Sequence, residues 1–351
     1  MWSNLVHSIP NALDLLALTT CIGALACRLW VVPSVPAESS VIQPLLVRLW
    51  FLLLACLAVL ALSSVIGLIQ RAAEMSGRPH GEVLSILHAV LLNSHYGQTW
   101  LVRVFALAML WVGWFLGRRK LDSRTVPVFM LVSAVLIALT RSASGHGADA
   151  GDLSLPELMD WFHLLAASLW SGSMVAFTAV IFPTWFRYGG QHVKLIADMA
   201  RRFSGLAGIA LAAVLLTGLY NAWIEVRTLS ALWTTSYGNI LSIKLLLVLV
   251  LVVLGASNRY ISVPLLKRLA GYPQTGDGFF TSFALRYLSR LQGNMDGTSA
   301  ARHLAHKVMA EVILMVGVLI CVALLIHETP ARHQPHTGHI ILQPHVGHGT
   351  H

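Results

Sequence analysis

Long runs of apolar residues constrain the fold of this chain more than any other feature of its sequence. The runs cover residues 52–62, 126–139, 206–219, 243–254 and 308–326. A helix needs roughly 20 mostly apolar residues to cross a bilayer, whereas a soluble protein of this length would alternate polar and apolar faces. Hydrophobic residues make up 56% of the chain and charged residues only 11%. The sequence therefore predicts an all-α, polytopic membrane helix bundle.

Eight membrane-spanning helices are predicted from these runs and the residues beside them. The apolar run nearest the N-terminus, residues 13–32, is interpreted as a retained helix, because no small-residue cleavage site clearly follows it. The segment from Glu82 to Asn93 is too short and too polar to cross, and it is predicted to lie outside before the third span. The predicted spans are residues 11–32, 46–70, 98–117, 126–141, 156–182, 203–225, 238–262 and 306–326.

Lysine and arginine gather in alternate loops, which orients the predicted bundle. By the positive-inside rule these loops are cytoplasmic, so eight spans place both termini outside. The net charge of +9 then reflects cytoplasmic loops and does not indicate nucleic-acid binding. The basic loop residues are Arg118, Arg119, Lys120 and Arg124, then Arg187, Lys194, Arg201 and Arg202, then Lys267, Arg268, Arg286, Arg290 and Arg302.

Most of the 16 histidines fall on the predicted outer side, including those of the last 25 residues. Residues 1–326 are predicted to form the bundle and residues 327–351 a flexible, His-rich tail. Within the tail, the segment 334–339 (QPHTGH) returns as 343–348 (QPHVGH). Imidazole suits copper, zinc and nickel, and affinity alone favours Cu(II). The tail is predicted to capture metal loosely, as an alternative to an inert polar end, through His333, His336, His339, His345, His348 and His351.

The fifth predicted span is the most informative helix. Asp160 and His163 lie one turn apart near its outer end, where ionisable residues are costly in lipid and indicate a functional site. Asp160 is predicted either to ligate a metal or to orient the His163 ring. His146 follows the fourth span on the same side, between two glycines, and is predicted to reach this site.

Other candidate ligands leave two interpretations open. Met174 lies 11 residues beyond His163, roughly 16 Å deeper, and is either a later station for Cu(I) or lipid-facing packing. Met159 is close to Asp160 but on a neighbouring face. His88 and His95 are seven residues apart on the predicted short outer helix, sharing a face as a solvated stripe or as a metal site. The four cysteines lie in apolar runs without a CxxC pair and are predicted to be buried apolar residues.

Three polar residues within later spans are predicted to be structural. Asn221 lies in the sixth span. Lys244, in the seventh, is predicted to snorkel towards the outer surface or to pair with an outer acid. Glu311, in the eighth, stands four residues from Lys307 and is predicted to form a local ion pair with it.

Several short segments together resemble the membrane domain of the copper resistance protein D family. They are 202–204 (RFS), 217–221 (TGLYN), 237–241 (YGNIL) with Lys244, and 258–259 (NR), with a second set formed by 144–146 (SGH), Asp160, 163–167 (HLLAA) and Trp170, and a third running from Gly97 through Trp100 to Arg103. The resemblance runs from about the third span to the end. It implies a multi-pass protein of the bacterial inner membrane that takes part in copper uptake or resistance, often beside a periplasmic, CopC-like copper-binding protein.

The residues and the resemblance together predict a non-enzymatic protein that binds copper, Cu(I) or Cu(II), at its periplasmic face and passes it into or across the bundle. No nucleophile–base constellation and no ATP-binding GxxxxGK[ST] segment is present in the sequence. Two alternatives remain: a copper-delivery or assembly factor that does not move copper across the membrane, and a haem-binding electron carrier using His146 and His163.

Overall fold

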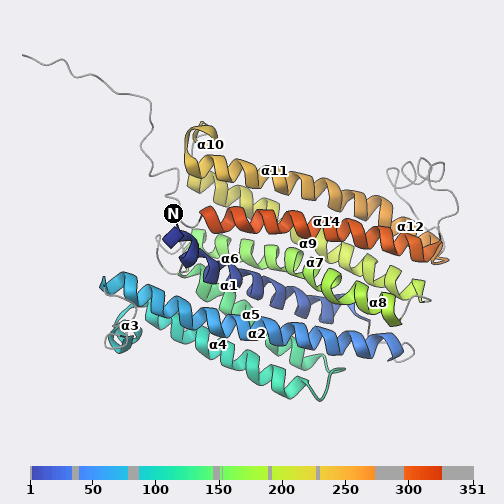
Figure 1. Cartoon of the computed structure of the whole chain (residues 1–351), viewed down its shortest axis with the longest axis horizontal. Helices are drawn as coiled ribbons and strands as arrows, with labels where there is room; N and C mark the ends of the chain where they lie inside the picture. Colours follow the sequence, from blue (N-terminus) through green and yellow to red (C-terminus); the bar gives the residue numbers. More distant parts are fainter. Residues whose placement is uncertain are drawn as a thin grey trace, which may run out of the picture.

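The computed structural model of the chain describes residues 2–33, 39–77, 87–144, 151, 153–188, 192–226, 230–272 and 296–325. Within them, eight helical segments are long and apolar enough to cross a membrane, which confirms the predicted bundle. Figure 1 shows them lying side by side along one common direction. They are α1 (Trp2–Ala26), α2 (Ser39–Ser76), α4 (His95–Gly117), α5 (Thr125–Ser142), the segment from α6 (Leu155–Ala167) to α8 (Phe182–Tyr188), α9 (Val193–Val226), the segment from α11 (Ser236–Ser257) to α12 (Val263–Leu269), and α14 (Gly297–Leu325).

The helices extend beyond most of the predicted spans because polar residues at the ends of a membrane helix continue the same backbone hydrogen bonding. Asp296 caps the first turn of α14, where its carboxylate accepts the backbone N–H of Ser299 at 2.9 Å. Hydrogen bonding by Ser299 lowers the pKa of this exposed carboxyl group. Two short helices, α3 (Leu87–Asn93) and α10 (Ala231–Thr234), stand at one end of the bundle.

The first helix is the centre of the packing. It contacts α2, α5, α6, α7 (Ser173–Ala176) and α14. Its closest approach is to the π-helical segment η5 (Ser168–Gly172), where two glycines allow the backbones to touch. A Cβ atom on Gly172 would lie 1.8 Å from the carbonyl oxygen of Thr19, and one on Gly23 would lie 2.0 Å from the backbone of Gly172. Helices α1 and α6–α8 therefore pack as one unit.

The first, fifth and seventh spans are not continuous α-helices, which the apolar pattern did not predict, and the first ends in the π-helical segment η1 (Cys27–Val31). The fifth contains the π-helical segments η5 and η6 (Phe177–Ile181), and the seventh contains η7 (Asn258–Ser262). A π-helical turn widens a helix locally and is frequent at functional sites. Residues of η5, η6 and η7 line a cavity that is described in the next subsection.

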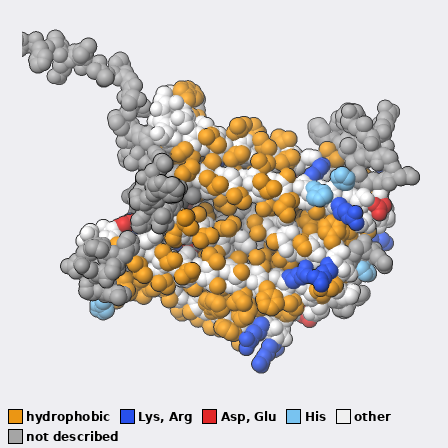
Figure 2. Space-filling model, in the orientation of Figure 1, with side chains coloured by type: hydrophobic (Ala, Val, Ile, Leu, Met, Phe, Trp, Pro, Cys, Tyr) orange, Lys and Arg blue, Asp and Glu red, His pale blue; other side chains and the backbone are white. Residues whose placement is uncertain are grey.

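The surface has an apolar belt with charged residues at one end. In Figure 2 hydrophobic side chains cover the flank of the bundle, and lysine and arginine gather towards one end of this face. Apolar side chains on the flank, such as Ile209 and Leu216, are about three-quarters exposed, at 75% and 74%, as expected for lipid-facing positions. We call the end with Arg118, Arg119, Lys120 and Arg268 the basic end, and the end with α3 and α10 the opposite end.

Candidate metal site and intramembrane polar sites

The ring of His163 lies near the opposite end, half-buried between α6 and α9. Its Nδ1 atom is 2.9 Å from Oγ1 of Thr217. The Thr217 hydroxyl is also 2.6 Å from the carbonyl oxygen of Ala213, a distance that favours donation of its only proton there. Oγ1 then accepts from His163 Nδ1–H, so the ring is held with an unprotonated Nε2. This is the tautomer that can bind a metal ion through Nε2.

Gly218 makes room for this ring. A Cβ atom at position 218 would lie 3.1 Å from Cε1 and 3.5 Å from Nδ1 of His163. The imidazole therefore lies against the backbone of α9, between the anchor of Thr217 on one side and the absent side chain of Gly218 on the other. Thr217 and Gly218 thus have complementary roles, because the threonine binds the ring and the glycine leaves space for it.

Asp160 lies one turn from His163 and is held from α5. One of its carboxylate oxygens accepts from Ser142 Oγ at 2.9 Å, and the same hydroxyl is 2.9 Å from the carbonyl oxygen of Glu157. The ammonium group of Lys244 interacts electrostatically with Asp160 and with His163. Of the two predicted roles for Lys244, snorkelling or pairing with an outer acid, the second would involve Asp160, and both stay predictions.

A second charged cluster joins the first four spans, and the sequence interpretation missed it. Asp14 on α1 forms ion pairs with Arg103 on α4 and with Arg141 on α5, the second at 2.7 Å. Ser63 on α2 donates to the same carboxylate at 2.6 Å. Asp14 is 5% exposed. This buried cluster therefore holds four helices together inside the bundle. A lone Asp within the first apolar run was the signal that could have revealed it.

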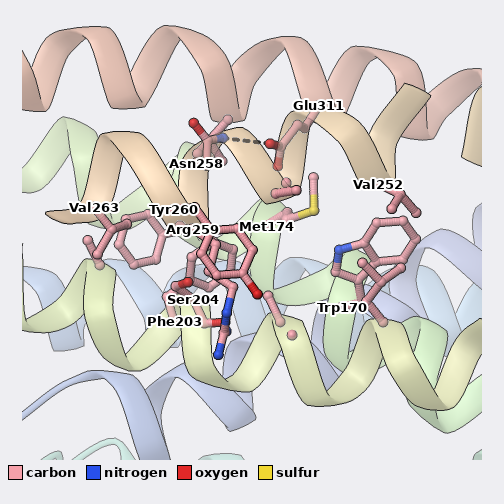
Figure 3. Close-up of a pocket in the computed structure, with 18 of the residues that line it drawn as sticks. Trp170, Met174, Phe203, Ser204, Val252, Asn258, Arg259, Tyr260, Val263 and Glu311 are labelled. Atoms are coloured by element: carbon pink, nitrogen blue, oxygen red, sulfur yellow. Dashed lines mark hydrogen bonds between the residues drawn. The ribbon is translucent and has the colours of Figure 1, made fainter. Parts of the chain in front are cut away.

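A third polar group borders a cavity of about 480 Å³ nearer the basic end. Its wall includes Met174 of the fifth span, Asn258 of η7 and Glu311 of α14, as Figure 3 shows. Asn258 Nδ2 donates to Glu311 Oε1 at 2.6 Å. Both residues are buried.

The structure corrects the predicted ion pair between Glu311 and Lys307. Lys307 Nζ donates instead to Ser262 Oγ at 3.0 Å and to Ser257 Oγ at 3.4 Å. The η7 segment brings these hydroxyls to the lysine, and it presents Asn258 to the carboxylate. Spacing along one helix could not show this, because the partners come from the seventh span.

Met174 is buried, at 1% exposure, and lines the cavity. The alternative that it faces lipid is therefore wrong, because α7, which carries Met174, packs against α1 and α14. Met159 is half-buried on α6, and Asn221 is half-buried on α9, one turn beyond Thr217. The four cysteines are buried and free, as predicted.

His88 and His95 do not share a helix face, which corrects the expected geometry. His88 lies on α3 and His95 begins α4, with Ser94 in an extended conformation between them. The hydroxyl of Ser94 accepts the backbone N–H of Gly97 at 2.9 Å and caps α4. The cap ends one helix and starts another, so the seven-residue spacing loses its helical meaning. Both histidines are exposed, and their metal role stays a prediction.

His146 and the tail histidines lie outside the described residues, so their predicted roles remain predictions. Among the residues that the structure describes, no three His, Cys, Asp or Glu side chains are close enough together to hold a metal ion. His163 and Asp160 thus form part of a candidate site that needs a further ligand.

The segments that carry the family resemblance contact one another in the structure. Thr217 and Gly218 hold the His163 ring. Arg259, next to Asn258, donates to the carbonyl oxygen of Ser204 at 2.6 Å. Thr235 begins α11 by accepting the backbone N–H of Gly238. These short motifs therefore join the fifth span to the sixth and the sixth to the seventh, and Asn258 joins the seventh to the eighth through Glu311.

Comparison with known proteins gives matches along most of the chain. The family model described as copper resistance protein D matches residues 197–325, and the model described as copper resistance protein D-like, N-terminal domain, matches residues 10–155. No solved structure matches.

Three curated relatives are similar to the chain. Copper transport protein CutJ of Bacillus subtilis (strain 168) is 28% identical over 173 residues, which is 48% of this chain and 31% of CutJ. Copper resistance protein D of Pseudomonas syringae pv. tomato is 27% identical over 219 residues, 59% of this chain and 67% of the relative. Inner membrane protein YebZ of Escherichia coli (strain K12) is 27% identical over 183 residues, 51% of this chain and 59% of YebZ. The chain thus spans less than a third of CutJ and about three fifths of YebZ.

Proposed function

Because the chain belongs to the copper resistance protein D family, we propose that it binds copper at the end opposite its basic loops and passes it into the helix bundle. The observation that carries this proposal is the anchored ring of His163, whose Nε2 is left free for a metal ion by the Thr217 hydrogen bond. Multi-pass membrane insertion follows from the eight apolar helices.

The distribution of charge supports the direction of the proposed site. Exposed arginine and lysine at the basic end fit the cytoplasmic side under the positive-inside rule, so the His163 end is periplasmic in this proposal. Histidines of the tail follow α14, which ends at the same side as α3 and α10. They collect copper loosely and hand it to the bundle.

The ligand set of the proposed outer site is His163 and His146, with Asp160 beside them. Imidazole nitrogen and carboxylate oxygen together suit Cu(II). The ammonium of Lys244 balances Asp160 while the site is empty, and an arriving copper ion replaces that charge. A CopC-like periplasmic protein is the proposed donor of copper to this end.

A double variant tests the site. Full-length protein carrying His146→Ala and His163→Ala is compared with wild type for copper bound per chain and for copper accumulated by cells. We expect the variant to lose one tightly bound copper ion per chain and to lower accumulation to that of cells lacking the protein. His303→Ala, an exposed histidine at the basic end, is the matched control and should change neither. Wild-type binding and accumulation in the double variant would refute the site.

The same preparations separate the rival functions. A Soret band in the visible spectrum would indicate a haem carrier instead. Copper binding without any effect on cellular copper would indicate a delivery factor that does not move the ion across the membrane.

A further inference from the structure

The cavity nearer the basic end is separate from the His163 site. It lies between the fifth span, α9, η7 and α14, and its wall is mostly apolar and aromatic. Met174, in this wall, is 11 residues beyond His163, roughly 16 Å along the helix. No single ion can contact both residues. The buried polar residues in the wall of this cavity therefore do not belong to the His163 site.

Two buried polar side chains that line this cavity, Asn258 and Glu311, have acceptor oxygens with few hydrogen-bond partners among the described residues. Glu311 receives one hydrogen bond, from the Asn258 amide. The amide oxygen of Asn258 is buried and has no hydrogen-bond partner among the described residues. A buried acceptor without a partner is costly, and a carboxylate inside a membrane bundle marks an ion pathway or binding site by default. A cation beside the Glu311 carboxylate would supply a partner that the described residues do not.

The basic groups nearby are engaged elsewhere. Lys307, which interacts electrostatically with Glu311, donates its hydrogen bonds to Ser257 and Ser262. Arg259 lines the cavity, but its guanidinium is exposed and donates to the backbone of α9. Neither cation forms an ion pair with the Glu311 carboxylate, which leaves that carboxylate available to an ion from outside.

Sulfur and an aromatic ring give the cavity a preference for a soft ion. The Met174 sulfur and the Trp170 indole both line it, and Figure 3 shows the sulfur lying between Glu311 and Trp170. Thioether sulfur selects Cu(I) over hard divalent ions. The face of a tryptophan ring attracts a cation. The helix α7, which carries Met174, packs against α14, which carries Glu311, so the two side chains come from adjoining elements.

The surrounding backbone is irregular in the same region. Trp170 belongs to η5, Phe177 to η6 and Asn258 to η7, and all three residues line the cavity. Such π-helical segments are frequent at functional sites. Their convergence on one cavity from two spans indicates a built site rather than a packing gap.

We propose that this cavity is a second metal site, inside the bundle, that binds a soft monovalent cation such as Cu(I) through the Met174 thioether and the Glu311 carboxylate, with Asn258 and Trp170 beside them. The proposal rests on the proposed function only in naming copper as the physiological ion. The order of the two sites along the fifth span then makes the cavity the station that follows His163.

Silver(I), a soft monovalent ion that does not change oxidation state, is the probe. Full-length wild type in lipid nanodiscs is titrated with Ag(I) against a competing chelator, beside Met174→Leu, Glu311→Gln and Met309→Leu. Met309 lies on α14 and is 46% exposed, so it is the matched control for loss of a thioether. We expect Met174→Leu to bind one Ag(I) fewer per chain, Glu311→Gln to bind that ion at least tenfold more weakly, and Met309→Leu to match wild type.

A second readout keeps the test valid if one variant folds poorly. Ag(I) should quench part of the tryptophan fluorescence of wild type, and Trp170→Phe should abolish that part. The His146→Ala, His163→Ala variant should keep the Met174-dependent ion, and Met174→Leu should keep Cu(II) binding at the outer site, so failure of either site is seen separately. Ag(I) binding in folded Met174→Leu and Glu311→Gln equal to wild type would overturn the proposal.

Discussion

Asp14 and Glu311 are carboxylates buried to the same extent, each 5% exposed, in two halves of one bundle. Asp14 is surrounded by Arg103, Arg141 and Ser63, so its charge is fully compensated. Glu311 has a neutral amide as its hydrogen-bond partner and a cavity beside it. The comparison teaches that burial of a charge alone does not mark a binding site. Glu311 differs from Asp14 in the cavity beside it and in having no ion pair among the described residues.

The spans of the two halves also differ in how much of their length is buried. In the N-terminal half, 78% of the residues in the apolar stretch of the first span are buried. The ionic cluster holds α1, α2, α4 and α5 together. In the C-terminal half, only 17% of the residues in the apolar stretch of the sixth span are buried, and 11% in that of the seventh. The compensated carboxylate of Asp14 therefore lies on the most deeply buried of the eight described spans.

The largest effect should come from breaking the ionic cluster. Asp14→Asn leaves two partly buried guanidinium groups without their carboxylate partner, and removing one member of a buried ion pair costs about 3–5 kcal/mol. Glu311→Gln, the matched variant in the other half, keeps an oxygen that can accept from Asn258 and should cost well under half as much. Unfolding of the detergent-solubilised proteins measures both. Equal stability of the two variants would contradict the contrast drawn between the two carboxylates.

A smaller effect should follow from freeing the His163 ring. Thr217→Val keeps the shape of the side chain but removes the oxygen that holds Nδ1–H, and loss of such an outer partner weakens metal binding about 10–100-fold. Thr178→Val is the control, because the Thr178 hydroxyl is buried without a hydrogen-bond partner in the described structure. Copper affinity by chelator competition measures the change. If both threonine variants bind alike, Thr217 does not set the tautomer.

The smallest effect should come from the lysine beside the site, and it has the opposite sign. Lys244→Met removes a positive charge that interacts with Asp160 and His163, which should strengthen copper binding by about three- to tenfold, or ~1 kcal/mol. Lys120→Met, at an exposed position of the basic end, serves as the comparison and should leave affinity unchanged. Weaker binding in Lys244→Met would show that the lysine supports the site instead of competing with the ion.

The sequence predicted the fold well because bilayer insertion depends on local apolar length, which residues such as 243–254 display directly. It also indicated Asp160 and His163 as a candidate site, since two ionisable residues one turn apart stand out in an apolar helix, and their metal role stays a prediction. It missed the partners that come from other helices, namely Thr217 for His163, Ser142 for Asp160 and Asn258 for Glu311. Contacts between helices depend on how the spans rotate and cross, and the π-helical segments that set this rotation leave no simple trace in the apolar pattern.

In the proposed function copper enters at the His163 end and passes into the helix bundle, and its passage through the bundle can be measured. Copper entry into liposomes that contain the purified full-length protein, followed with a copper-sensitive dye inside, tests it most directly. The account predicts entry faster than into protein-free liposomes for wild type and for His303→Ala, and a fall to the protein-free rate for His163→Ala. Equal entry with wild type and His163→Ala, or wild-type entry no faster than without protein, would contradict it.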